Sequence, residues 1–293
     1  STAKRAKARV LVVDDNDRVR SRLERGLSDE GYTVCAVGGN SQQLFKSALR
    51  AARRFRPHVA IVDLRLTDNA DTSDTSGLDL LKKLKSESQG VKLIAYSAYL
   101  NPTIDRELSD VGATWVDKSD SPQLLKQKVA DFAAAASAES RSFTVLWPRK
   151  WNIQSTLDNL FKKAPPESLV NDVLSQLFPR FRRLNVHHIE NRDTPSASPV
   201  SRGRSLVVRV TPEGARAKKI VKIARPKRIT RESRNYRRHV VDQVVGVFHT
   251  QLENSSTFWD VGASVYTFLG TGGEGGLQTF GDFYADAHDV NGL

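Results

Sequence analysis

Short apolar segments alternate with amphipathic segments five times over the first 139 residues, and this alternation restricts the folds open to the chain. The apolar segments are rich in β-branched residues, which is typical of buried strands. Each is followed by apolar residues spaced three or four positions apart, which predicts a helix. The predicted strands are 10–13, 34–37, 59–64, 91–96 and 114–116, and the predicted helices are 17–31, 41–55, 77–86, 102–111 and 122–138.

Five strands that are each followed by a helix predict an α/β fold, with a parallel sheet covered by helices on both faces. The nearly continuous apolar character of the strands agrees with this, because central parallel strands are buried on both sides. In such sheets the functional site lies beyond the carboxyl ends of the strands.

Three aspartates stand at these strand ends. Asp14 and Asp15 follow the first strand, and Asp63 ends the third, which is central in this topology. Three carboxylates that converge on one sheet edge repel one another, and a divalent cation that prefers oxygen ligands removes the repulsion. Mg²⁺ is the usual cation beside phosphate, where it also neutralises charge on a transferring phosphoryl group.

Two further polar side chains follow the next two strands. Ser97 offers a hydroxyl after the fourth strand, and Lys118 offers a cation after the fifth. A phosphoryl group carried on Asp63 would need both, an amine for its charge and a hydroxyl for one of its oxygens.

The motifs VLVVDDND, IVDLRL, LIAYSAY and WVDKS occur in this order, each at a strand end. Together they resemble the receiver domain of bacterial two-component response regulators, over about residues 8–135. The resemblance implies a flavodoxin-like, doubly wound five-stranded domain, which we assign to residues 1–139. It also implies a phospho-accepting signalling protein rather than an enzyme, with self-dephosphorylation at most.

By the same resemblance, Asp63 is the phosphoacceptor, and its donor is a phosphohistidine on a sensor histidine kinase or a phosphotransfer protein. Asp14 and Asp15 hold Mg²⁺ together with Asp63, and the backbone carbonyl of Arg65 is a further ligand. The acyl phosphate on Asp63 is then the signal that changes the choice of partner.

The resemblance gives the remaining site residues their roles as well. Ser97 and Lys118 contact the phosphoryl group, and Trp115 stands three residues before the lysine, where the family places a switching aromatic. Ser119 departs from the family, which has proline after the lysine, and we expect this loop to differ. The segment Thr67–Ser76 is longer than the usual loop after the phosphoacceptor.

The second half divides into a predicted helical linker and loop region, 140–200, and a basic α+β output domain, 201–293. In the linker region, helices are predicted at 156–163 and 167–178 and a loop at 193–201. In the output domain, strands are predicted at 205–210, 219–224 and 263–269, with a helix at 230–245 and a glycine-rich segment at 270–276.

Lys222 lies in the strand KKIVKIA, and Glu232 lies in the helix TRESRNYRRH. This arrangement resembles the antiparallel sheet and helix of the N-terminal lobe of kinase-like and aminoglycoside-phosphotransferase-like folds. There, a strand lysine paired with a helix glutamate holds nucleotide phosphates, so the pair is either a nucleotide site or an ordinary surface ion pair. The sequence has no kinase-type glycine-rich loop and no HRD-like or DFG-like motif, and we therefore expect an inactive module that binds a protein partner.

The net charge of +12 falls mainly on the second half, and 14 basic residues lie between positions 202 and 238. A positive surface attracts nucleic acid, acidic proteins or anionic ligands. A nucleic-acid-binding, transcriptional output is therefore the alternative to the protein-binding module, although it is not favoured; a receiver-containing scaffold that is never phosphorylated is another. The basic residues available for phosphate contacts are Arg202, Arg204, Arg225, Lys227, Arg228, Arg231, Arg234, Arg237 and Arg238.

Two general features bear on location. No apolar run reaches the roughly 18 residues that a membrane helix needs, and we expect no membrane association. The single cysteine, Cys35, excludes an intrachain disulfide and fits a reducing cytoplasm.

Overall fold

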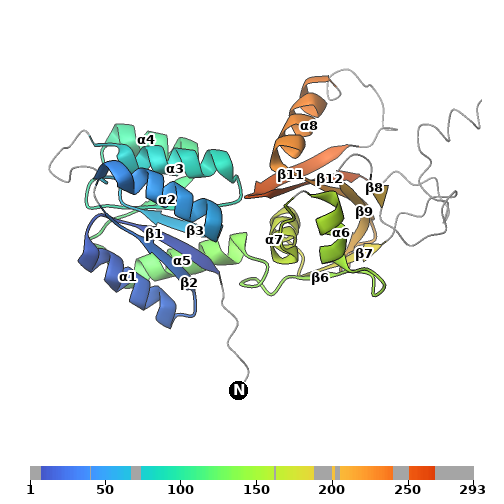
Figure 1. The fold of residues 1–293 in the computed structure, drawn as a ribbon, viewed down its shortest axis with the longest axis horizontal. Coiled ribbons are helices and arrows are strands. Elements are labelled where there is room, and N and C mark those ends of the chain that lie inside the picture. Colours follow the sequence, from blue (N-terminus) through green and yellow to red (C-terminus); the bar gives the residue numbers. More distant parts are fainter. Residues whose placement is uncertain are drawn as a thin grey trace, which may run out of the picture. The chain divides into compact units, whose positions relative to one another are not determined.

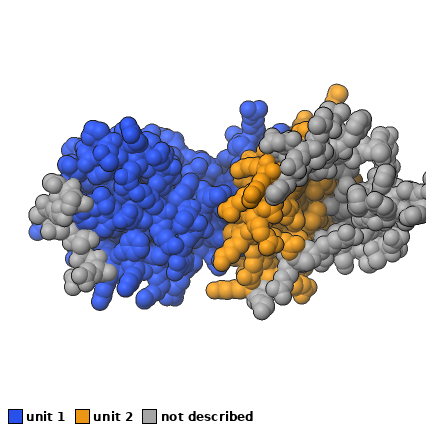
Figure 2. Space-filling model, turned by 90° about the horizontal axis from the view of Figure 1, so that it is seen from above, with its two compact units in different colours: residues 1–144, 168–182, 256–261 blue, residues 145–167, 183–255, 262–293 orange. Residues whose placement is uncertain are grey.

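A computed structural model describes residues 8–39, 41–66, 74–161, 163–187, 200–201, 205–239 and 251–267. The chain forms two compact units, coloured separately in Figure 2. Unit 1 consists of residues 1–144, 168–182 and 256–261, and unit 2 consists of residues 145–167, 183–255 and 262–293.

Unit 1 is built on a five-stranded parallel sheet with the strand order β2-β1-β3-β4-β5. This confirms the α/β prediction. The helices α1 and α5 cover one face of the sheet, and α2, α3 and α4 cover the other (Figure 1). The strands are β1 (Arg9–Val13), β2 (Thr33–Val37), β3 (Val59–Val62), β4 (Lys92–Tyr96) and β5 (Ala113–Val116). The helices are α1 (Asp17–Asp29), α2 (Ser41–Phe55), α3 (Ser76–Glu87), α4 (Pro102–Val111) and α5 (Pro122–Ala136).

Local signals in the sequence fix several helix ends. The side chain of Asn16 caps α1 by accepting the backbone N–H groups of Arg18 and Val19. Asn101 caps α4 in the same way and is followed by a proline, and α4 ends at Gly112, which has a left-handed φ of 72°. These caps hold the helices in register with the strand ends that carry the polar residues.

The strand β3 is fully buried. It ends at Val62, two residues before the predicted end at Leu64. Asp63 and Leu64 therefore leave the sheet and form the start of the loop that follows. The core on one face of the sheet joins β1 and β3 to apolar residues of α1 and α5, including Leu23, Leu27 and Val129. Burial of this apolar surface is the main term that stabilises unit 1.

The second sheet has the order β11-β12-β10-β9-β7-β6, with β8 paired to β9. The pairs β10–β12, β9–β10, β7–β9 and β8–β9 are antiparallel. Its strands are β6 (Thr144–Leu146), β7 (Arg183–His187), β8 (Val200–Ser201), β9 (Leu206–Pro212), β10 (Lys219–Ala224), β11 (Leu252–Phe258) and β12 (Val261–Thr267). The other helices are α6 (Ile153–Leu160), α7 (Glu167–Leu177) and α8 (Pro226–His239).

Several boundaries in the second half differ from the predicted ones. The strand predicted at 263–269 begins earlier, as β12, and the preceding β11 was not predicted, because its sequence LENSSTF is largely polar. Helix α8 begins at Pro226, four residues before the predicted start. The predicted loop at 193–201, the end of the predicted helix at 230–245 and the glycine-rich segment at 270–276 lie mostly or wholly outside the described residues. Among the helices that are described, none is both long and apolar enough to cross a membrane.

Candidate functional site

The strand ends of unit 1 bring the three predicted aspartates together. Val13 of β1 lies opposite Val62 of β3 in parallel register, so the residues that follow these positions leave the sheet side by side. The backbone N–H of Asp63 donates to the carbonyl of Val13 at 2.9 Å. One carboxylate oxygen from each of Asp14, Asp15 and Asp63 lies within 4.8 Å of the others. Asp14 and Asp63 are buried, and Asp15 is half-buried.

Lys118 joins this carboxylate cluster from the end of β5. Its Nζ lies 2.5 Å from Oδ2 of Asp63 and 2.9 Å from Oδ2 of Asp14. Burial raises the pKa of Asp14 above its ordinary value, and the Lys118 ammonium opposes this shift. Burial also acts to lower the pKa of Lys118, but its hydrogen bonds and charge attraction to the two carboxylates leave that pKa raised. The lysine is therefore held in its charged form beside the acids.

The donor set fits a hard divalent cation. All three side chains offer carboxylate oxygens, which are the ligands that Mg²⁺ prefers. Two of them are buried, and a single ammonium group cannot balance three ionised carboxylates. Asp14, Asp15 and Asp63 are the residues that would hold the ion, with the backbone carbonyl of Arg65 as a predicted further ligand.

Ser97 and Trp115 lie beside Lys118. Ser97 follows β4 and is buried, and its backbone carbonyl accepts the indole N–H of Trp115 at 3.2 Å. The same carbonyl accepts the backbone N–H of Lys118 at 3.4 Å. The structure thus brings together Asp14, Asp15, Asp63, Ser97 and Lys118, and it ties the half-buried Trp115 to the backbone of this group.

Comparison with known proteins agrees with this geometry. The family model for the response regulator receiver domain matches residues 10–130. Residues 10–130 form a response regulator receiver domain. This confirms the receiver part of the resemblance noted from the motifs. The kinase-like part, in the second half, has no such support.

Relatives of the receiver domain include two mycobacterial regulators. The probable transcriptional regulatory protein TcrX of Mycobacterium tuberculosis is 38% identical over 89 residues, 30% of this chain and 33% of that protein. The DNA-binding response regulator MtrA of Mycolicibacterium smegmatis is 32% identical over 90 residues, 31% of this chain and 34% of that protein. The chain thus spans about a third of the length of these two relatives. Among solved structures, the chemotaxis protein CheY4 of Vibrio cholerae is 26% identical, with a TM-score of 0.36, over 43% of this chain and 98% of that chain.

The loop after Lys118 lacks the proline of the family pattern, and hydrogen bonds hold its conformation instead. The carboxylate of Asp117 accepts both the backbone N–H and the hydroxyl of Ser119, each at 2.7 Å. The backbone N–H of Asp120 donates to the carbonyl of Asp117 at 3.1 Å. This side-chain-closed turn fixes the loop without the proline that the family uses. The hydrogen bonds from Ser119 lower the pKa of Asp117.

Two features of the receiver site were not predicted from the sequence. The guanidinium of Arg65 lies 4.1 Å from the centre of the Tyr99 ring, which is a cation–π contact. Gly77 packs so closely on the loop after β3 that a Cβ atom there would lie 1.9 Å from the backbone oxygen of Asp63. Arg65 stands two residues after Asp63, and Tyr99 stands two residues after Ser97. Residues that follow neighbouring parallel strands gather at one edge of the sheet, so the sequence could have predicted this contact.

Residues 67–73, which make up most of the segment Thr67–Ser76 after Asp63, lie outside the described residues. At its described end, the carboxylate of Asp74 accepts the backbone N–H of Ser76 at 2.9 Å. The hydroxyl of Ser76 lies 3.2 Å from the backbone nitrogen of Leu66, which donates to it. These two contacts fix the start of α3 beside the Asp63 loop.

The predicted pair in the second half is formed within unit 2. Lys222 Nζ lies 2.5 Å from Oε2 of Glu232, and Oε1 of the same carboxylate accepts the hydroxyl of Tyr266 at 2.6 Å. Burial and the neighbouring Glu232 carboxylate raise the pKa of the Tyr266 hydroxyl. The three residues come from β10, α8 and β12, so this contact attaches the helix to the sheet.

Proposed function

We propose that this chain is a phosphorelay response regulator in which Asp63 accepts a phosphoryl group and the resulting acyl phosphate switches an output module. The observation that carries the proposal is the convergence of Asp14, Asp15 and Asp63 within 4.8 Å, with Lys118 Nζ 2.5 Å from Asp63. The donor class is a phosphohistidine, on a sensor histidine kinase or on a phosphotransfer protein. The chain acts as a signalling protein and has at most a self-dephosphorylating activity.

The transfer step follows from the positions of these groups. A carboxylate oxygen of Asp63 attacks the phosphorus atom in line, the P–N bond of the donor breaks, and its electron pair returns to the imidazole nitrogen. Lys118 balances the negative charge on the phosphoryl oxygens, and the hydroxyl of Ser97 donates to one of them. Asp14, Asp15 and Asp63 would hold a Mg²⁺ ion, which would supply further neutralisation of the negative charge.

Intact-mass measurement after incubation with Mg²⁺ and acetyl phosphate tests the proposal. The wild-type chain should gain the mass of one phosphoryl group, and the Asp63→Asn variant should gain none. Asp79→Asn is the matched control, because Asp79 is an exposed aspartate in the first turn of α3 and should leave the gain unchanged. A phosphoryl gain in the Asp63→Asn variant would overturn the assignment of the phosphoacceptor.

For the output, we propose an inactive kinase-like module that binds a protein partner. Its support is the Lys222–Glu232 pair between a strand and a helix, in the arrangement noted from the sequence. Measuring the binding of an adenine nucleotide tests whether this pair is a nucleotide site. Lys222→Met should abolish binding of an adenine nucleotide if the pair is a nucleotide site. Lys219→Met is the matched control, because Lys219 lies on the same strand and pairs with Glu253 instead.

The second candidate output is a nucleic-acid-binding module. Two observations favour it: the matched relatives are named a transcriptional regulatory protein and a DNA-binding response regulator, and α8 carries a row of exposed basic side chains. The exposed residues on or next to α8 are Arg225, Lys227, Arg231, Arg234, Arg237 and Arg238. Binding to duplex DNA that weakens steeply with salt, as phosphate contacts require, would support this output. If the chain did not bind duplex DNA even at low salt, a nucleic-acid-binding output would be excluded.

A further inference from the structure

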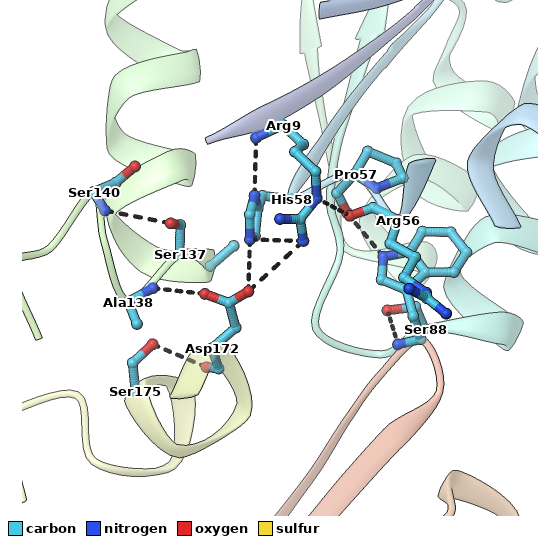
Figure 3. A network of polar contacts seen from close by, with 12 residues as sticks. Arg9, Arg56, Pro57, His58, Ser88, Ser137, Ala138, Ser140, Asp172 and Ser175 are labelled. Carbon is cyan, nitrogen blue, oxygen red and sulfur yellow. Dashed lines mark hydrogen bonds and ion pairs between the residues drawn. The ribbon is translucent and has the colours of Figure 1, made fainter. Parts of the chain in front are cut away.

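A buried polar cluster lies at the edge of the receiver sheet opposite the carboxylate site. His58 directly precedes β3, and Arg9 begins β1, so both stand at the strand ends remote from Asp63. The backbone N–H of Arg9 donates to Nδ1 of His58 at 2.9 Å, as Figure 3 shows. The imidazole is only 3% exposed. Neither residue has a role in the proposed phosphoryl transfer.

Asp172 of α7 completes this cluster from a distant part of the sequence. Its Oδ2 lies 2.9 Å from Nε2 of His58, and its Oδ1 accepts the backbone N–H of Ala138 at 2.9 Å. The guanidinium of Arg9 is 3.7 Å from Oδ2 (Figure 3). The carboxylate thus holds α7 against both the start of the sheet and the end of α5.

The turn between β11 and β12 packs on the same imidazole. The ring of Phe258 stacks on His58 with 5.2 Å between ring centres and 13° between ring planes. Trp259 donates its indole N–H to the carbonyl of Pro57 at 2.9 Å and its backbone N–H to the hydroxyl of Ser88 at 3.2 Å. Residues 168–182 and 256–261 are therefore parts of unit 1 that meet at His58.

The hydrogen bonds fix the protonation state of the imidazole. Since Nδ1 accepts the N–H of Arg9, it carries no proton, and the ring proton is on Nε2, which donates to Asp172. A second proton could bind only at Nδ1, where it would point at the N–H of Arg9. An imidazolium ion therefore cannot keep the Arg9 bond and would be left partly unpaired in a buried position.

The charges around His58 do not remove this conflict. Arg9 places its Nη2 3.3 Å from Nε2, which repels a second positive charge, and Asp172 is already shared with that guanidinium. Glu139 is the other acid that acts on the ring, and the nearby Arg56 is paired with Asp260 at 2.5 Å. Burial, opposed by Asp172 and reinforced by Arg9, lowers the pKa of His58 below its ordinary value.

We propose that His58 is a proton-sensitive latch, which holds residues 168–182 and 256–261 on the receiver sheet when neutral and releases them when a solvent proton binds at Nδ1. The neutral ring bridges the backbone of β1 to Asp172 and supports the Phe258 ring. Protonation breaks the bridge at its Arg9 end and places an ion in an apolar stack.

The sign of the pH effect follows from the lowered pKa. The released state binds the proton near the ordinary imidazole value of about 6.5, and the latched state binds it only at lower pH. The latched state is therefore fully favoured above about pH 6.5. Below that value the opening equilibrium rises by up to about tenfold for each pH unit, until the pH reaches the pKa of the latched state.

Amide hydrogen exchange of the full chain, at about pH 8 and about pH 5.5 on either side of the ordinary imidazole pKa, tests the latch. After correction for intrinsic exchange, the amides of α7 and of residues 256–261 should exchange several-fold faster at the lower pH. His58→Gln should lose this pH dependence, because its amide donates to Asp172 but does not titrate. His187→Gln should keep it, since His187 is the half-buried histidine of β7 and has no part in the cluster.

Two outcomes would overturn the latch: corrected exchange of α7 that does not change with pH, or an unchanged pH dependence in His58→Gln. If His58→Gln does not fold, NMR titration of the wild-type imidazole decides instead. We expect the pKa of His58 to lie below its ordinary value and α7 to be released as the ring is protonated. An ordinary pKa for His58 would exclude the latch. The Asp63→Asn variant should keep the pH dependence, so the result is independent of the phosphoryl-transfer proposal.

Discussion

The ammonium group of Lys118 lies 2.5 Å from a carboxylate oxygen of Asp63, although 55 positions separate the two residues in the chain. The contact exists because β3 and β5 end at the same edge of the sheet, on either side of β4. Lys118 also reaches Asp14, so one cation holds two buried carboxylates together. The stability of the receiver site therefore depends on the attraction between one ammonium group and two carboxylates, and removing any one of these charges should change it.

Replacing Lys118 with alanine should destabilise the receiver domain by about 3 kcal/mol in the absence of Mg²⁺, because two buried carboxylates lose their cation. Mg²⁺ should recover part of this loss. Urea unfolding, with and without Mg²⁺, measures both effects. Lys126→Ala is the matched control, since its exposed ion pair with Glu30 should contribute at most about 1 kcal/mol. Equal effects of the two substitutions would contradict the role described for Lys118.

Replacing Asp14 with asparagine should have the opposite effect on stability without metal. The pKa of Asp14 is raised in the folded state, so ionisation of this group costs the folded state free energy as the pH rises above the unfolded value near 3.8. At pH 7 this cost is fully present, and the neutral amide removes it. We expect a gain of roughly 1 kcal/mol in metal-free urea unfolding.

The same Asp14→Asn variant should lose stabilisation by Mg²⁺, because it lacks one of the three predicted carboxylate ligands. Thermal unfolding over a Mg²⁺ titration checks this. The wild-type melting temperature should rise with the ion, and that of the variant should rise much less. A variant that responds to Mg²⁺ like the wild type would remove Asp14 from the metal site.

The receiver fold could be predicted from sequence because its signals are local. Apolar runs mark β1 and β3, and side-chain caps such as Asn16 and Asn101 mark helix starts. The carboxylate site could be predicted as well, because parallel strands bring their ends together whatever the chain length between them.

The contacts of His58 could not be predicted in this way. Asp172 lies 114 positions away, on a helix whose apolar spacing gives no hint of a buried polar partner. The strand β11 was missed because its half-exposed residues are largely polar and do not alternate with apolar ones. Pairings of this kind depend on long-range packing, which no local pattern encodes.

Replacing Gly77 with alanine should destabilise the receiver and slow phosphorylation of Asp63. The added Cβ would lie 1.9 Å from the Asp63 backbone oxygen and 2.7 Å from Cα of Leu64, so the backbone that presents Asp63, the proposed phosphoacceptor, must move. A cost of about 1–3 kcal/mol is typical of such overpacking. Urea unfolding and the initial rate of mass gain with acetyl phosphate measure the two effects.

Gly26→Ala is the matched control for Gly77→Ala. Gly26 lies inside α1, where an added Cβ would meet only the side chain of Lys126, at 4.0 Å. The alanine should stabilise the helix by about 0.5–1 kcal/mol and leave phosphorylation unchanged. If both variants accepted phosphate at the wild-type rate, close packing at Gly77 would have no role in presenting Asp63.

Phosphorylation should change the fluorescence of Trp115. Its indole N–H donates to the backbone carbonyl of Ser97, and we propose that the hydroxyl of Ser97 donates to a phosphoryl oxygen, so the hydrogen bond and the exposure of the ring should change together. The protein has four tryptophans, and the Trp115→Phe variant gives the contribution of the other three. We expect an emission change on adding Mg²⁺ and acetyl phosphate that is lost in both Trp115→Phe and Asp63→Asn. An equal change in Trp115→Phe would assign the signal to another tryptophan and leave Trp115 as a packing residue.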